Sequence, residues 1–254
     1  MHRHLPPGCR RLLRGLPAQR RRDRTLGLDG RGRAPAIDRR GPAAARGAAV
    51  SAGEAIARHL RRAVRRLDDP PVPLLADSGL RVHAVPARAL ARPAAVLVPF
   101  VPRGDRLSVL FTRRNPHLRN HAGQVSFPGG GIDPGDVDAV AAALRETREE
   151  TGIDETQVDP FGYLDSLDTV SGYRVTPVTG FVRSDYALRL HQDEVEEVFE
   201  VPLDYILEPA TLRREGFPWA GSERDIFAFD WEGRRIWGAT AAILKNLIDR
   251  MQAR

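Results

Sequence analysis

The sequence has almost no cysteine and lacks any long hydrophobic run. Cys9 is the only cysteine among 254 residues, which excludes an intramolecular disulfide framework and a cysteine-based zinc cluster. The longest nearly unbroken apolar stretch, residues 93–102, is too short to cross a bilayer as a helix. With 42% hydrophobic and 28% charged residues, the composition is that of an ordinary globular protein. We therefore do not expect a membrane protein.

Lysine is also nearly absent, and the basic charge is concentrated at one end. Lys245 is the only lysine, so arginine supplies the other 38 basic residues. We interpret this bias as the codon usage of a GC-rich genome and expect a bacterial cytoplasmic protein. Residues 1–50 have a formal charge of +10 and the remaining residues a charge of −4. The high isoelectric point, about 10.3, therefore reflects the first fifth of the chain.

Residues 1–50 consist mainly of Arg, Pro, Gly and Ala without helical or strand periodicity. Such a segment buries too little apolar surface to offset its ordering entropy, so we predict a disordered arm. Three interpretations stay open: a nucleic-acid-binding arm, an organelle transit peptide, or a start site assigned too far upstream, with Val50 as the alternative start. The segment lacks the amphipathic helix of a transit peptide and is low in serine. We favour the third interpretation and do not expect nucleic acid as a partner.

A helical pattern begins at Ser51. Ser51 and Glu54 have the spacing of a capping box, and apolar residues then recur at helical intervals as far as Leu67, before Asp68-Asp69-Pro70-Pro71. A proline-rich linker follows. We therefore divide the chain into an arm (1–50), a helix with its linker (51–91) and a main domain (92–254).

The main domain has many short apolar runs and few helical patterns. This mixture predicts an α+β fold, arranged as an α/β/α sandwich with a mixed central sheet. A loop is expected at 112–124, and Asp136 or Asp138 is expected to cap a helix that ends at Gly152. A second helix is expected at 239–251. The expected strands are residues 94–101, 107–111, 125–127, 158–165, 173–182, 194–201, 225–230 and 235–237.

The segment from Gly129 to Ile153 contains the residues most suited to chemistry. Glu146, Glu149 and Glu150 lie at positions i, i+3 and i+4, so their carboxylates share one helix face and repel each other. A hard divalent cation would remove this repulsion, and carboxylate oxygens suit Mg²⁺ or Mn²⁺. Arg145 can pair with a carboxylate and orient it. On the carboxylates alone, a solvated charged helix face is the favoured interpretation.

The full spacing resembles the Nudix box, G-x5-E-x7-R-E-U-x-E-E-x-G-U, where U is aliphatic. Gly131 begins the match, Arg145-Glu146 and Glu149-Glu150 form its acidic core, and Gly152-Ile153 closes it. Two positions depart from the pattern. Val137 replaces the first Glu, and Thr147 occupies a position that is usually aliphatic.

The preceding segment, residues 110–130, resembles the signature of the coenzyme A diphosphatase branch of this family, L-L-T-x-R-S-x3-R-x3-G-x3-F-P-G-G. Phe111 and Asn115 replace Leu and Ser, and members of this branch also tend to lack the first Glu of the box, with Asp133 and Asp136 fitting their G-G-x-x-D-x-x-D pattern. The matching residues are Leu110, Thr112, Arg114, Arg119, Gly123, Phe127, Pro128, Gly129 and Gly130.

The cationic residues of this segment suit a substrate that is rich in phosphate, because arginine binds phosphate oxygens bidentately. Since side chains alternate along a strand, at most one of Arg113 and Arg114 should face the site. His117 and His121 could act at the site or simply form hydrogen bonds within the loop.

The resemblance implies a Nudix fold and Mg²⁺- or Mn²⁺-dependent hydrolysis of coenzyme A or acyl-CoA to 3′-phosphoadenosine 5′-phosphate and 4′-phosphopantetheine. Glu194, Glu196 and Glu197 are candidates for the general base. Two alternatives are a Nudix hydrolase of another nucleoside diphosphate derivative, such as ADP-ribose or NADH, and a non-catalytic nucleotide-binding protein. The sequence does not decide between a monomer and a homodimer. The implied catalytic residues are Arg145, Glu146, Glu149 and Glu150, with the three glutamates as metal ligands, and the implied substrate-binding residues are Arg114, Arg119, Gly123, Phe127, Gly129 and Gly130.

Overall fold

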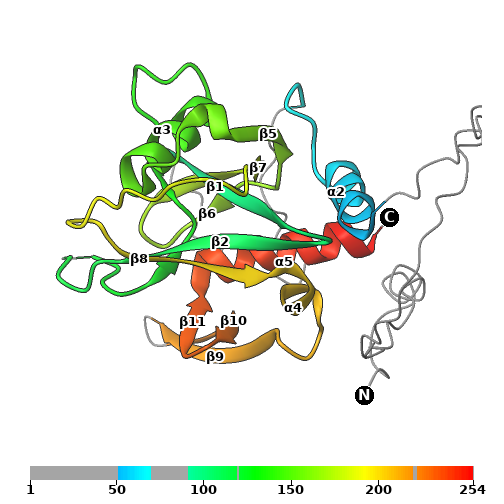
Figure 1. The fold of residues 1–254 in the computed structure, drawn as a ribbon. Helices are drawn as coiled ribbons and strands as arrows, with labels where there is room; N and C mark the ends of the chain where they lie inside the picture. The colour runs from blue at the N-terminus through cyan, green and yellow to red at the C-terminus, as the bar shows by residue number, and fades with distance from the viewer. Residues whose placement is uncertain (1–50, 70–90, 119, 220–221, 254) are drawn as a thin grey trace, which may run out of the picture.

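The computed structural model describes residues 51–69, 91–118, 120–219 and 222–253 (Figure 1). The predicted arm, with Cys9, lies outside the described residues, as do Arg119 and most of the proline-rich linker. Among the helices described, none combines the length and the apolar character needed to span a bilayer.

An eight-stranded mixed sheet is built around β1 (Arg92–Arg103). One edge of β1 pairs in parallel with β7 (Tyr173–Val182). Its other edge pairs antiparallel with two strands, β2 (Arg106–Arg114) at its C-terminal end and β4 (Gly129–Gly131) at its N-terminal end. The strand β4 is thereby fixed beside the helix that follows it. The remaining strands are β5 (Val158–Tyr163) and β6 (Leu167–Asp168), which pair with β7, and β3 (Val125–Ser126) and β8 (Val195–Pro202), which pair with β2.

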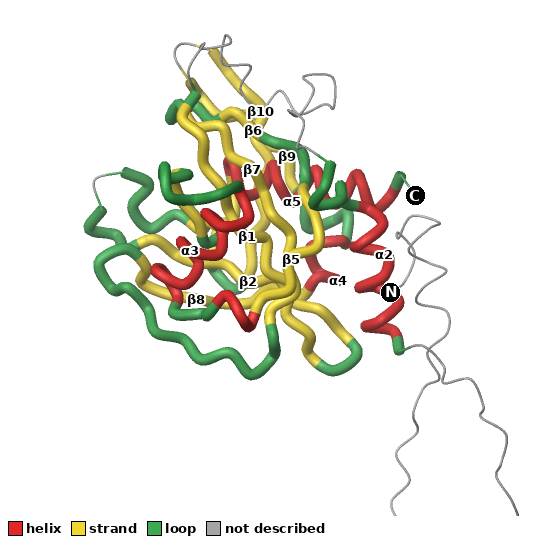
Figure 2. The backbone as a smooth tube through the Cα atoms, turned by 90° about the horizontal axis from the view of Figure 1, so that it is seen from above, coloured by secondary structure: helices red, strands yellow, loops and turns green. Residues whose placement is uncertain are grey.

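Helices cover both faces of this sheet (Figures 1 and 2). Leu97 of β1 belongs to a core that it shares with the helix α3 (Ala139–Thr151). The next residue, Val98, belongs to a second core together with α2 (Ala52–Ala63) and α5 (Gly238–Gln252). This change of face between successive residues is the period of a β-strand. The predicted α/β/α sandwich is confirmed.

A small three-stranded sheet packs against α5 below the central sheet in Figure 1. It was predicted only in part, because the hairpin of β10 and β11 was expected but its third strand β9 was not. The short helix α4 (Leu203–Leu207) and the 3₁₀ helix η1 (Glu155–Gln157) were also missed. The strands of the small sheet are β9 (Arg213–Trp219), β10 (Ser222–Trp231) and β11 (Arg234–Trp237).

The helix α2 begins as predicted but ends earlier than predicted. Ser51 and Glu54 form both hydrogen bonds of the capping box. The helix ends at Ala63 because Arg65 forms an antiparallel bridge with Tyr163, with two backbone hydrogen bonds of 2.9 Å. A Cβ on residue 162 would lie 2.2 Å from the Arg65 carbonyl oxygen, so glycine is required there. The helical periodicity of the sequence therefore continues beyond the helix itself.

One further expectation is corrected, and one open alternative is decided. The strand β2 continues to Arg114, three residues into the expected loop, because β8 pairs with it along most of its length. Asp138, rather than Asp136, caps α3, with its side chain accepting a hydrogen bond from the Ala141 amide at 2.8 Å.

Leu60 and Leu67 allow a matched test of where α2 contributes to stability. Leu60 is fully buried, whereas Leu67 is 42% exposed beyond the end of the helix. We expect Leu60→Ala to lower the free energy of unfolding by about 2–5 kcal/mol because it leaves a cavity in the core. Leu67→Ala should change it by less than about 0.5 kcal/mol. Equilibrium urea unfolding measures both, and equal losses would contradict the described end of the helix.

Candidate active site

The glycines of β4 let the backbone approach its neighbours more closely than any side chain would allow. A Cβ on Gly129, where φ is +153°, would lie 2.4 Å from the carbonyl oxygen of Ala95. A Cβ on Gly130 would lie 2.5 Å from the carboxyl carbon of Glu146. The first glycine permits pairing with β1, and the second leaves room for a glutamate of the next helix.

The helix α3 has a defined end and a well-packed inner face. Gly152 adopts a left-handed conformation, with φ of +78°, at the C-terminus of the helix. Thr147, which departs from the aliphatic residue of the Nudix box, is fully buried, and its hydroxyl donates to the Ala143 carbonyl at 2.6 Å. The threonine therefore packs like an apolar residue without an unpaired polar group, which explains why the substitution is tolerated.

Glu150 is a buried carboxylate with few partners. Its residue is 3% exposed. The Gly129 amide donates to Oε2 at 3.2 Å, and Nη1 of Arg114 lies 3.8 Å from Oε1. Burial raises the pKa of Glu150 to about 8, against these two contacts, which lower it. The structure thus places a carboxylate where its charged form is poorly solvated.

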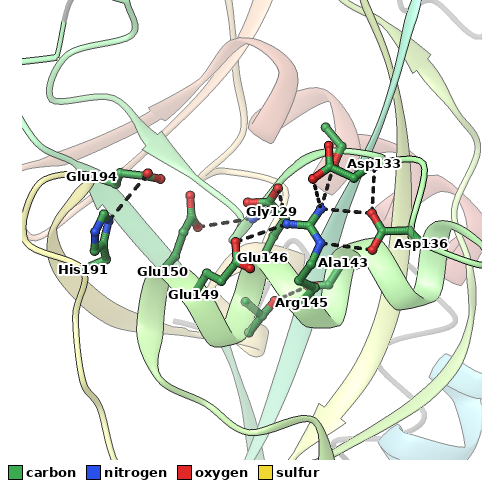
Figure 3. Close-up of polar contacts among 12 residues, drawn as sticks. Gly129, Asp133, Asp136, Ala143, Arg145, Glu146, Glu149, Glu150, His191 and Glu194 are labelled. Atoms are coloured by element: carbon green, nitrogen blue, oxygen red, sulfur yellow. Dashed lines mark hydrogen bonds and ion pairs between the residues drawn. The ribbon is translucent and has the colours of Figure 1, made fainter.

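Glu146 and Glu149 lie on the same helix in different surroundings (Figure 3). Partial burial raises the pKa of Glu146, although Arg145 donates to its Oε1 at 3.0 Å. The Glu149 side chain is 54% exposed and accepts from Arg145 at 3.2 Å. The three glutamates predicted as metal ligands are therefore not equivalent, because Glu149 is exposed whereas Glu146 and Glu150 are not.

Asp136, the residue before the departure at Val137, holds Arg145. It accepts two hydrogen bonds from Arg145, from Nε and Nη2, each of 3.0 Å, and these bonds lower the pKa of Asp136. Val137, at the position of the missing Glu, is 90% exposed. The carboxylate that holds Arg145 thus comes from the preceding residue. The G-G-x-x-D-x-x-D pattern was its signal in the sequence, but Asp136 was considered there as a helix cap.

Arg113 and Arg114 point to opposite faces of β2, as the alternation predicts. Arg114 lies against Glu150, whereas Nε of Arg113 lies 3.1 Å from Glu196 and 3.2 Å from Glu197. Glu197 also pairs with Arg234. The Nε atom of Arg114 is buried and has no hydrogen-bond partner among the described residues. A buried donor beside Glu150 is thus available to a ligand.

The other predicted substrate-binding residues differ in what they can contact. Gly123, with φ of +67°, closes the β2–β3 loop by donating to the Arg114 carbonyl at 3.2 Å. Phe127 is 3% exposed and stacks on Phe111, with ring centroids 5.0 Å apart. The ring thus belongs to the hydrophobic core, and its contact with substrate stays a prediction.

The two histidines of the β2–β3 loop are exposed and far less constrained than the residues around Glu150. Nδ1 of His121 lies 2.8 Å from Oε1 of Gln124, within the same loop. The backbone amide of His117 donates to the Asn115 side chain at 2.9 Å. These contacts favour the interpretation of both residues as part of the loop's own hydrogen bonding.

Glu194 joins the acidic cluster from a segment that lies outside both motifs. Figure 3 shows it beside Glu150, with His191 Nδ1 lying 3.6 Å from its Oε1. Its negative charge raises the pKa of both Glu146 and Glu150. Of the three candidates for a general base, Glu194 is therefore the one near the cluster, whereas Glu196 and Glu197 pair with Arg113.

The donor set fits a hard divalent cation. Glu146 and Glu150 are partly or fully buried carboxylates, and each disfavours the charge of the other. Oxygen ligands of this type suit Mg²⁺ or Mn²⁺. Within the described residues, no three acidic, histidine or cysteine side chains already stand in a ligand arrangement. Glu146 and Glu150 are thus the residues that could hold a cation together, with Glu149 reaching it only by leaving Arg145.

The raised pKa of Glu150 predicts a specific pH dependence of stability. The folded protein binds the proton of the Glu150 carboxyl more tightly than the unfolded chain does. The stability that this proton contributes is therefore fully present below about pH 4.5 and is lost as the pH rises toward about 8. We expect Glu150→Gln, which stays neutral, to gain stability relative to the parent between pH 5 and pH 8. Urea unfolding in EDTA measures this, with the exposed Glu155→Gln as control. A difference independent of pH would contradict the assignment.

Comparisons with known proteins agree with this geometry. The profile of the NUDIX domain family matches residues 91–220. The uncharacterized Nudix hydrolase NudL of Escherichia coli K12 is 42% identical over 156 residues, which are 61% of this chain and 81% of NudL. NudL of Shigella boydii serotype 18 has the same identity and coverage.

Two solved structures are also similar to parts of this chain. An Ap4A hydrolase from C. elegans, in a binary complex, is 23% identical with a TM-score of 0.39, over 44% of this chain and 80% of that one. A MutT/nudix family protein from Enterococcus faecalis is 18% identical with a TM-score of 0.43, over 68% of this chain and 66% of that one. On the family profile and the NudL relatives, this chain belongs to the Nudix hydrolase family.

Proposed function

We propose that this Nudix hydrolase cleaves the diphosphate bond of coenzyme A or acyl-CoA. The observation that carries the proposal is the arginine-bearing segment 110–130, whose residue Arg114 lies 3.8 Å from Glu150. This segment resembles the coenzyme A diphosphatase signature, and it enters the site directly beside the acidic helix of the Nudix box. The proposal therefore rests on two motifs that meet at one place.

The residues around Glu150 suit the binding of a diphosphate. The buried Nε of Arg114 has no hydrogen-bond partner in the part of the chain that the structure describes, and the guanidinium charge complements phosphate oxygens. At Gly130 of the glycine strand, Gly129–Gly131, the absence of a side chain lets the backbone lie close to the Glu146 carboxylate, so that backbone and carboxylate are both near Arg114 and Glu150. Arg119, the second arginine of the signature, is proposed to bind the substrate as well and lies outside the described residues.

The reaction is the addition of water across the bridging P–O–P bond. The water oxygen forms a bond to one phosphorus, the bridging oxygen leaves on the other phosphate, and the water proton is transferred to a base. The products are 3′-phosphoadenosine 5′-phosphate and 4′-phosphopantetheine, acylated where the substrate is. We assign the proton to Glu194, since it is the candidate near Glu146 and Glu150.

Nudix hydrolases generally use divalent metals such as Mg²⁺ or Mn²⁺. Here Glu146 and Glu150, with Glu149, would hold the cation, which neutralises charge on the phosphate and lowers the pKa of bound water. Arg145 orients Glu146 and is itself oriented by Asp136 through two hydrogen bonds. The chain thus supplies positioning and charge, which are the main requirements of phosphoryl chemistry.

A substrate panel tests the proposal against its alternatives. With Mg²⁺ or Mn²⁺, we expect hydrolysis of CoA and acetyl-CoA to the two products named above, identified by mass, and slower hydrolysis of ADP-ribose and NADH. Glu150→Gln serves as the control for contaminating activity. A preference for ADP-ribose would make this a Nudix hydrolase of another nucleotide, and no hydrolysis at all would favour a nucleotide-binding protein.

Gly130 and Gly131 allow a matched test of the site geometry. An alanine at 130 would place its Cβ 2.5 Å from the Glu146 carboxyl carbon, whereas one at 131 would meet nothing within 4 Å. Because the clash is with the end of a flexible side chain, the fold should survive while the carboxylate moves. We expect Gly130→Ala to lower kcat about 100-fold. Gly131→Ala should stay within a factor of about 3, and equal effects on kcat would refute this role.

A further inference from the structure

The segment 189–194 approaches the site from outside both sequence motifs, and α3 holds it on one side. The Arg189 amide donates to the Thr151 carbonyl at 2.7 Å, and the His191 amide donates to the Glu150 carbonyl at 3.0 Å. A Cβ on Gly152 would lie 2.7 Å from the Arg189 Cβ, so the glycine that ends the Nudix box also permits this contact. These bonds hold the beginning of the segment. At its end, the amides of Glu194 and Val195 donate to the His191 carbonyl at 2.9 Å each, and Val195 begins β8.

Asn115, directly after β2, holds the other end. Its side-chain Nδ2 donates to the Gln192 carbonyl at 2.6 Å, and its backbone amide donates to the Glu194 carbonyl at 2.8 Å. Its Oδ1 accepts from the His117 amide at 2.9 Å. Any residue at 115 could make the backbone bond. The side-chain bridge needs a polar group that donates to one partner and accepts from the other, as the two ends of the Asn115 amide do.

We propose that Asn115 is a positioning residue, whose side-chain amide fixes segment 189–194 so that the Glu194 carboxylate stays beside Glu146 and Glu150. The inference rests on the role given to Glu194 in the proposed function. The adjacent residue Arg114 contacts Glu150 from the same strand end. The end of β2 thus contributes to the site in two ways. Arg114 places its charge beside Glu150, and Asn115 holds the segment that carries Glu194.

A double-mutant cycle with Glu194 tests this. We expect Asn115→Ala to lower kcat by about tenfold or more because a displaced carboxylate reacts poorly, with KM nearly unchanged. In the Glu194→Gln background, the same substitution should cost less than about twofold in kcat, since residues that act through each other are not additive. Asn120→Ala, at an exposed asparagine of the same loop, is the control and should leave kcat unchanged.

Hydrogen exchange measured by mass spectrometry adds a readout that does not depend on turnover. Asn115→Ala should speed exchange in a peptide covering 189–195 at least several-fold, whereas Asn120→Ala should not. The kinetics use whichever panel substrate the parent hydrolyses, so a failure on CoA alone would reject the proposed substrate and not this inference. If the parent hydrolyses none of the panel, the exchange comparison decides on its own.

Two results would overturn the proposal. An equal loss of kcat in the parent and in the Glu194→Gln background would mean that Asn115 acts through another group, such as Arg114. Unchanged exchange in 189–195 would mean that its side chain does not hold the segment. The proposal is supported if Asn115→Ala lowers kcat in the parent, has little effect in the Glu194→Gln background, and speeds hydrogen exchange in 189–195.

Discussion

The site depends on keeping the Glu150 carboxylate away from water. A buried charge of this kind is costly unless a partner compensates it, and here one backbone amide and one distant guanidinium do so only in part. The neighbouring elements determine how much of the Glu150 charge is compensated. The glycine strand supplies the amide, β2 supplies the arginine, and Glu146 and Glu194 add negative charge instead of relieving it. A cationic ligand would remove the cost, so the arrangement is suited to binding one.

The strand that carries Arg114 and the glycine strand come together because both pair with β1. The strands β2 and β4 share the same edge of β1, so Arg114 and the glycine strand end near each other. The helix α3 is the next element of the chain after β4, and it packs against β1. The geometry of the site is thus a consequence of sheet topology, and the side chains only complete it.

The sequence predicted the parts of the site whose spacing has a local cause. The capping box at Ser51, the helix that carries Glu146 and Glu150, and the opposite orientations of Arg113 and Arg114 all follow from short-range periodicity. It failed where a distant partner decides. The helix α2 stops because Arg65 pairs with Tyr163, about a hundred residues away, and the strand β9 forms only because β10 lies beside it. Glu194 could not be chosen from its neighbours for the same reason.

The exposed side chain of Val137 bears on how relatives of this protein are recognised. In this chain Val137 is exposed, and the carboxylate that holds Arg145 is that of Asp136, one residue earlier. A search that demands a glutamate at position 137 would therefore score an exposed position and ignore Asp136, which holds Arg145. Patterns written for the contact, allowing an acid at either position, would describe the same physical constraint and would retain chains like this one.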